Sequence, residues 1–238
     1  MLYKPRLAET EDPVFVLAPL LMVELGDDAE PAMAAPVTVC AADSGLHIGD
    51  GLYPRVTYTW QYPRDDSLRP PNARRPSSAS APSVTYSLAV TLGPDGFPLV
   101  YEVTGPSSGR RAGVSHILFV SESLEARAAE RFGPPPPGRR FSVEPPLEQA
   151  PAVVVAGVVA DGPVVMGPYV YVDRAGDVTT LSCRCAAAQV DDVPLAPYYD
   201  LVVADSEQCR RDETAHASAG QREDVFADPV AVLRWPLE

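Results

Sequence analysis

The chain has 238 residues, and 46% of them are hydrophobic, which is enough apolar surface for a sizeable folded core. A formal net charge of −13 disfavours nucleic acid and anionic membranes as partners, because both carry negative charge themselves. The 27 prolines interrupt helices and central strands. We therefore expect short regular elements and long proline-rich loops within one globular domain, residues 1–238.

The N-terminal part of the chain predicts neither a signal peptide nor a membrane span. Residues 1–9 lack an apolar signal core, and Pro19 and Glu24 interrupt the apolar run at residues 14–25. That run predicts one or two strands with a bend at Pro19. Four cysteines are too few for a secreted disulfide framework. We therefore expect a soluble, cytoplasmic protein whose cysteines are all thiols.

Residues 37–83 change character three times. A short strand is predicted at residues 37–40 and a loop at residues 41–51. Residues 56–62 alternate threonine with β-branched and aromatic side chains, which predicts a half-buried strand. Residues 63–83 are rich in proline, serine and arginine, with little apolar surface to offset the entropy of ordering. We interpret this segment as a flexible loop within the domain; the alternative is a docking segment that folds on binding.

Two antiparallel hairpins are indicated by their turns. The Gly-Pro-Asp-Gly sequence at residues 93–96 separates the apolar runs 84–92 and 97–103, and its Asp-Gly pair tolerates positive φ. Residues 166–172 and 178–183 form a second pair of strand-like runs around a polar turn that contains glycine. These hairpins predict mainly antiparallel pairing.

One amphipathic helix is predicted at about residues 121–132. Ser121 is a suitable N-cap, acidic residues follow in the first turn, and apolar residues then recur every four positions. Gly133 suits a C-terminal position of positive φ, and the prolines of residues 134–137 cannot continue a helix. Both ends of the helix are therefore specified locally.

The helix is flanked by two apolar runs, residues 114–120 and 152–160, which we interpret as core strands and as possible parallel neighbours. Shorter strand candidates lie at residues 201–204 and 229–235, and residues 205–220 fit either a polar helix or solvated chain. Together the elements predict an α+β fold: a mainly antiparallel or mixed sheet, one packed helix and long proline-rich loops.

Cys183 and Cys185 form the most reactive pattern in the chain. Two thiolates one residue apart could share a zinc ion, but zinc sites take about four ligands, and Cys40 and Cys209 are isolated in the sequence. On a strand both sulfurs would face the same side, which suits core packing equally well. We interpret the pair as free thiols and keep zinc binding as the alternative.

Candidate catalytic groups gather at residues 43–51, where Asp43, Ser44, His47 and Asp50 supply a hydroxyl, an imidazole and two carboxylates. These are also common turn residues, and the serine lies in no Gly-x-Ser-x-Gly elbow. We therefore interpret the stretch as a turn.

The remaining histidines and acidic pairs predict no site either. His116 is interpreted as structural and His216 as solvated. The pairs at residues 27–28 and 191–192 lack the spaced oxygen ligands of a calcium loop. The junction at Ser121 has no glycine-rich phosphate loop. We assign no catalytic, cofactor-binding or metal-binding residue.

The function expected from these observations is a non-catalytic protein-interaction or structural module that contacts another protein or a copy of itself. Its positive support is the tyrosines, because Tyr169 and Tyr171 share one side of a strand and Tyr198 and Tyr199 adjoin another. Tyrosine is favoured where a surface is buried on association, although these rings could equally cover the chain's own core. The alternative is an enzyme, hydrolase-like and possibly zinc-dependent, whose site is assembled from separate loops.

Overall fold

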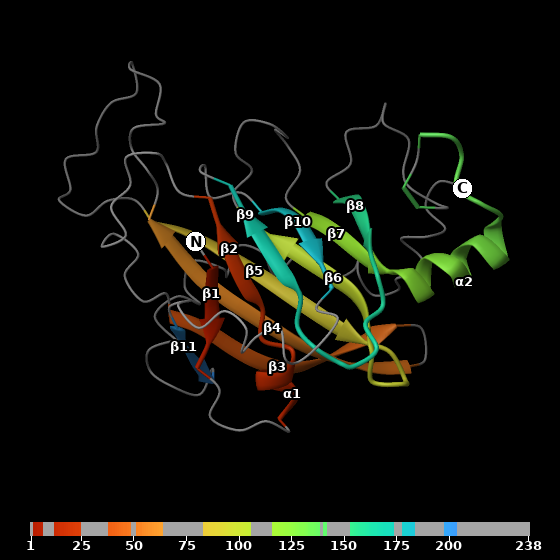
Figure 1. Cartoon of the computed structure of the whole chain (residues 1–238). Helices are drawn as coiled ribbons and strands as arrows, with labels where there is room; N and C mark the ends of the chain where they lie inside the picture. Colours follow the sequence, from red (N-terminus) through yellow and green to blue (C-terminus); the bar gives the residue numbers. More distant parts are fainter. Residues whose placement is uncertain are drawn as a thin grey trace, which may run out of the picture.

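The computed structural model describes residues 2–6, 12–24, 38–48, 51–63, 83–105, 116–138, 140–141, 153–173, 178–183 and 198–203. This part of the chain forms two helices and eleven strands (Figure 1). In chain order they are β1 (Leu2–Pro5), α1 (Pro13–Val16), β2 (Leu20–Val23), β3 (Thr38–Ile48), β4 (Gly51–Pro63), β5 (Ser83–Leu92), β6 (Pro98–Thr104), β7 (His116–Ser121), α2 (Glu122–Phe132), β8 (Val153–Val159), β9 (Tyr169–Val172), β10 (Val178–Ser182) and β11 (Tyr198–Val203).

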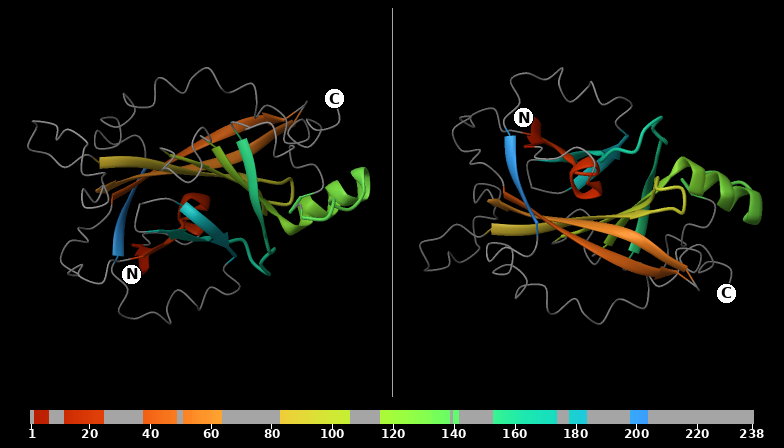
Figure 2. Two further views of the ribbon diagram at one scale, coloured as in Figure 1. Left: turned by 90° about the horizontal axis from the view of Figure 1, so that it is seen from above. Right: turned by 90° about the horizontal axis from the view of Figure 1, so that it is seen from below.

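The strands form one mixed sheet in the order β10-β9-β2-β1-β11-β3-β4-β5-β6-β7-β8. Four neighbouring pairs are parallel, namely β1 with β11, β11 with β3, β2 with β9 and β7 with β8, and the others are antiparallel. Figure 2 shows the sheet curling over, so that β1, β2, β9 and β10 face the wall formed by β3 to β8 and β11 lies at the bend. The predicted mixed sheet is confirmed.

The predicted α+β class needs correction, because the sheet curls into a nearly closed, barrel-like shape. A sheet that folds over covers its own apolar face, so it needs little helix to bury that face. α1 has only four residues, and α2 covers one end of the outer face. Neither described helix has the length and apolar character needed to span a bilayer.

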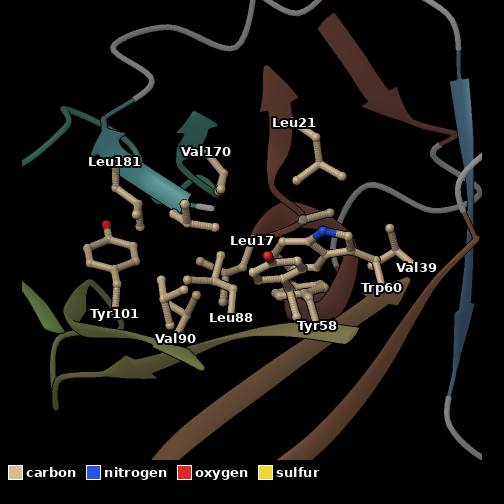
Figure 3. Close-up of a cluster of buried hydrophobic side chains, with 14 of the residues drawn as sticks. Leu17, Leu21, Val39, Tyr58, Trp60, Leu88, Val90, Tyr101, Val170 and Leu181 are labelled. Atoms are coloured by element: carbon tan, nitrogen blue, oxygen red, sulfur yellow. The ribbon is translucent and has the colours of Figure 1, made fainter. Parts of the chain in front are cut away.

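The main core lies between the two walls of the curled sheet (Figure 3). Side chains from the β3 to β6 wall meet those of α1 and of the smaller wall, and the Trp60 and Tyr86 rings stack with centroids 6.2 Å apart. The labelled members are Leu17, Leu21, Val39, Tyr58, Trp60, Leu88, Val90, Tyr101, Val170 and Leu181. The alternation of inward and outward side chains along β4 and β5 produces this core.

A smaller core lies on the outer face, where α2 covers β7 and β8. Ser121 caps the helix by accepting a hydrogen bond from the Leu124 N–H at 3.1 Å, and Gly133 ends it with φ of 90°. Asp161 adds a second acceptor, 2.9 Å from the Ser123 N–H. The predicted helix and the parallel pairing of its flanking strands are confirmed.

Both predicted hairpins are confirmed as the antiparallel pairs β5–β6 and β9–β10. In the first, Gly96 has φ of 80°, and its N–H donates to the Gly93 carbonyl at 2.9 Å. Positive φ at this position is what the Asp-Gly sequence tolerates. Turn chemistry therefore specified the connection locally.

The apolar run at residues 14–25 is only partly a strand. Its first part is the short helix α1, because Asp12 accepts a hydrogen bond from the Val14 N–H at 2.9 Å and Pro13 occupies the first helical position. β2 begins after Pro19. The N-cap, Asp12, lies just before the apolar run. The apolar residues alone therefore predicted a strand where the chain forms a short helix.

The predicted loop at residues 41–51 is wrong, because most of it is strand. β3 continues to Ile48 and pairs with β4 from Gly51 onward. Pairing with β4, which continues without a break from Val39–Trp60 to Ile48–Gly51, overrides the turn composition of this stretch. The structure also contains β1, which the sequence did not indicate and which pairs with β2 and β11.

The end strands β8 and β10 approach each other without pairing. Some of their Cα atoms lie within 8 Å, whereas a strand inserted between them would need about 9.6 Å. The Arg140 guanidinium donates a hydrogen bond to the Ala156 carbonyl on β8, and the register of β10 shifts between Val178 and Thr180. Such features blunt a sheet edge against strand addition. The loop predicted at residues 63–83 has its two end residues in strands, because Pro63 ends β4 and pairs with Ser83, the first residue of β5. The rest of that loop, residues 64–82, and the predictions for residues 205–220 and 229–235 lie outside the described residues.

Candidate interaction surface around Tyr198

Tyr198 lies on the outward face of the sheet, where β1 and β11 run parallel. It is opposite Lys4, and the pairing continues with the Arg6 N–H donating to the Tyr199 carbonyl at 3.1 Å. Because side chains alternate along a strand, Tyr198 and Tyr199 point to opposite faces. Tyr199 is fully buried and donates its hydroxyl to the Pro19 carbonyl at 2.8 Å, whereas Tyr198 is 48% exposed.

Two cations lie near the exposed Tyr198 ring. The Lys4 ammonium lies 4.6 Å from the Tyr198 ring centroid and the Arg6 guanidinium carbon lies 6.0 Å from it, within the range of cation–π attraction. Lys4 is buried beside the ring, while the Arg6 side chain is 71% exposed. A chain of net charge −13 thus presents a local basic site here.

Arg6 also lies 3.8 Å from the carboxylate of Asp200, whose side chain is 57% exposed. An ion pair this exposed contributes about 0–1 kcal/mol, so it leaves both groups able to bind elsewhere. We call Arg6, Tyr198 and Asp200, with Lys4 beside the ring, the Tyr198 surface.

The other tyrosines singled out in the sequence have different positions. Tyr169 and Tyr171 do share one side of β9, and both are half-buried. Opposite them on β2 are Leu20 and Met22, on the same outward face. Tyr198 is the member of the group that the structure exposes, and the alternation between buried and exposed neighbours could not be read without the register of β11.

The cysteines divide into two kinds. Cys183 is a half-buried thiol at the end of β10, packed against the main core. Cys40 is disulfide-bonded, which corrects the prediction that all four cysteines are thiols; the other half of the bridge lies outside the described residues. Sequence spacing does not reveal which cysteines a fold brings together. Disulfides are rare in a reducing cytoplasm, so the cytoplasmic location stays a prediction.

The zinc alternative gains no further ligands in the part of the chain that the structure describes. Cys185 lies outside it, and no group of three or more His, Cys, Asp or Glu side chains is found within it. The acidic pairs at residues 27–28 and 191–192 and the side chains of His47 and His116 also lie outside the described residues, as do Asp50 and His216.

The hydroxyl and carboxylate at the start of the predicted catalytic stretch do not converge. Asp43 and Ser44 are consecutive residues of β3 and therefore point to opposite faces. The Ser44 hydroxyl donates to the Arg55 carbonyl at 3.4 Å. Partial burial and the neighbouring Asp12 raise the pKa of the Asp43 carboxyl, although Asp43 itself is exposed. The interpretation of a turn is replaced by a strand, and no nucleophile–base pair forms from these two residues.

Sequence reasoning missed a cluster near the seam between β8 and β10. Tyr101 on β6 is 5% exposed, and burial, together with Asp161 and Cys183, raises the pKa of its phenol. The carboxylate and the thiol that act on this phenol come from two other segments of the chain. No local signal identifies such a set, because it depends on how distant segments are arranged in the fold.

A second missed feature is the ion pair of Arg55 and Glu102 on the outward face. The guanidinium reaches diagonally across β5 to the carboxylate at 2.5 Å, with side chains 20% and 10% exposed. Ala89, opposite Glu102 in the ladder, is buried on this same face, and its small side chain leaves room for the pair. The Arg55 Nε is buried without an acceptor. Because the charges neutralise each other, we interpret the pair as structural.

Comparisons with known proteins leave these sites to be interpreted on their own geometry. No family model, curated protein or solved structure matches the chain.

Proposed function

We propose that the chain is a non-catalytic protein-interaction module that binds its partner through the Tyr198 surface. The observation that carries the proposal is an aromatic ring, 48% exposed, on a pair of parallel strands, with cationic groups 4.6 and 6.0 Å from its centroid. Tyrosine and arginine dominate the binding energy of protein interfaces because each combines a large contact area with hydrogen bonding. Holding the ring on strands limits the entropy lost on binding.

The geometry favours binding of a partner through the outward face of the sheet over strand addition at a sheet edge. Strand addition would need an open sheet edge, but β8 and β10 come too close for another strand and carry an arginine contact and a register shift. Among the described residues, the other large exposed apolar side chains are Leu52, Val158 and Val164, on the β3–β4 hairpin and around β8, and Val203, which points to the opposite face of β11 from Tyr198. The Tyr198 surface combines exposure, aromaticity and charge.

The test compares capture by the wild-type protein with capture by Tyr198→Ala. Immobilised protein is exposed to extract of its own cells, and retained chains are quantified by mass spectrometry. We expect the main retained chain, whether a different protein or the protein itself, to fall at least about tenfold with Tyr198→Ala, as for an interface hot spot. Leu52→Ala, which removes a more exposed apolar side chain far from the site, is the control and should leave capture unchanged. Equal capture by all three proteins contradicts the proposal.

The alternative is an enzyme, and the cluster of Tyr101, Asp161 and Cys183 is the observation that favours it. Burial of Tyr101, with lesser contributions from Asp161 and Cys183, raises the pKa of its phenol, and perturbed ionisable groups drawn from separate segments are what catalytic sites use. A hydrolase screen with a Cys183→Ser variant tests this function, because turnover through the thiol would be lost in that variant. If Cys183 is a zinc ligand, native protein will also hold about one zinc per chain, and Cys183→Ser will lose it.

A further inference from the structure

We propose that the partner of the Tyr198 surface is a second copy of this chain, bound around a two-fold axis that runs between β1 and β11. This inference rests on the proposed function, because it names the partner of the same surface. Its basis is the charge pattern of the surface, which is complementary to itself.

Opposite charges lie side by side on two parallel strands. The register places Lys4 opposite Tyr198 and Pro5 opposite Tyr199, so that Arg6 and Asp200 are neighbours in the next outward row. Within one chain they are 3.8 Å apart and largely exposed, which makes their mutual pairing weak. Each can therefore gain from a second, better-desolvated partner of opposite charge.

In the proposed dimer the outward faces of two copies lie against each other. The two-fold axis lies between these faces, parallel to the strands and midway between β1 and β11, so that β1 of each copy lies over β11 of the other. Arg6 of each copy then faces Asp200 of the other, which gives two identical ion pairs from one exposed pair. The same operation sets Tyr198 of each copy against the basic β1 side of the other, where its ring can accept a cation–π contact. Isologous contacts of this kind are the commonest way in which homo-oligomers close.

The net charge determines the conditions under which the dimer forms. Two chains of −13 repel each other, so contact requires that the distant charges be screened. At an ionic strength of about 0.15 M the screening length is about 8 Å, which weakens the repulsion between remote charges more than the attraction between groups in contact. The dimer is therefore expected at physiological ionic strength.

The experiment is sedimentation equilibrium at that ionic strength on wild-type protein, Arg6→Glu, Asp200→Arg and an equimolar mixture of the two variants. Both residues are exposed, so far-ultraviolet circular dichroism should show all three proteins folded. We expect a wild-type dimer, at least about a tenfold rise in the dissociation constant for each variant alone, and restored dimerisation in the mixture, since one variant then presents two acidic groups to two basic ones. A role confined to one chain cannot produce rescue by mixing.

The remaining outcomes separate this inference from the proposed function. A wild-type dimer that the charge reversals do not weaken, or whose variants fail to recover on mixing, places the dimer contact elsewhere and overturns the inference. A strictly monomeric wild type also overturns it; if Tyr198→Ala then still loses a captured protein, the proposed function stands with a different partner. If the wild-type protein is a monomer and Tyr198→Ala captures as much protein from the extract as wild type does, both the inference and the proposed function are contradicted.

Discussion

At the scale of single residues, two buried tyrosine hydroxyls hold the segment that contains α1. Tyr58 donates to the Val14 carbonyl and Tyr199 to the Pro19 carbonyl, each at 2.8 Å. Tyr58→Phe leaves a buried carbonyl without this donor, so we expect a loss of about 1–2 kcal/mol in the free energy of unfolding, measured in urea. Tyr198→Phe removes an exposed hydroxyl and should change the stability by less than about 0.5 kcal/mol. Equal effects of the two variants would contradict the anchoring role.

Because of Tyr101, we expect the free energy of unfolding to fall as the pH rises through the alkaline range. Burial first, then Asp161 and Cys183, raise the pKa of its phenol above the ordinary value of 10.0. In the unfolded chain the phenol loses its proton near its ordinary pKa, while the folded protein still holds it, so the folded state loses stability as pH rises above about 10. Urea unfolding between pH 8 and 11 should show this decline, and Tyr101→Phe should show a shallower one. Parallel curves for the two proteins would refute the assignment.

At the scale of elements, α2 depends on acceptors at its first turn. Ser121, 1% exposed, accepts from the Leu124 N–H, and Asp161 accepts from the Ser123 N–H. Ser121→Ala should reduce the free energy of unfolding by about 1 kcal/mol and speed amide exchange at Leu124. Asp161→Asn keeps a carbonyl acceptor for Ser123 and serves as the matched control, with a smaller loss. A larger loss for Asp161→Asn would mean that its charge, not its hydrogen bond, supports the helix.

The close approach of α1 to the segment directly before β9 depends on Gly167. A Cβ at Gly167 would lie 2.1 Å from the Leu17 carbonyl oxygen, and the Gly167 N–H donates to the Val16 carbonyl at 3.0 Å. Gly167→Ala must therefore push backbone apart, and we expect a loss of about 1–3 kcal/mol in thermal or urea unfolding. Gly157→Ala is the control, because its Cβ would meet the Phe119 ring at an ordinary 3.4 Å. Equal stability of both variants would show that α1 can shift freely.

At the scale of the whole molecule, the two walls of the curled sheet share one core. Leu88 is fully buried between the two walls. Leu88→Ala should lower the free energy of unfolding by about 2–5 kcal/mol. Because β5 and β9 contribute to the same core, Leu88→Ala should raise amide exchange in both strands equally, as measured by mass spectrometry. Leu52→Ala, on an exposed side chain, should change neither strand. Faster exchange in β5 alone would mean that the two walls open independently.

The sequence by itself determined the elements whose causes are local. Ser121 and Gly133 fix the ends of α2, and the Asp95-Gly96 turn fixes the β5–β6 hairpin, because caps and turns act through hydrogen bonds and φ values a few residues apart. The helix between the two apolar runs indicated that they could be parallel neighbours, and β7 and β8 do pair in this way. The tyrosine pattern indicated Tyr198 as a candidate contact residue, but not that its side chain is exposed.

Only the tertiary structure decided the curl of the sheet and the positions of the sites. β1 pairs with β11 nearly the whole length of the chain away, and that register alone exposes Tyr198 beside Lys4 and Arg6 while burying Tyr199. The cluster around Tyr101 likewise joins segments distant in sequence. Contacts between distant segments leave no periodic or spacing signal, because their free energy arises when the sheet closes and not from the residues beside them in the chain.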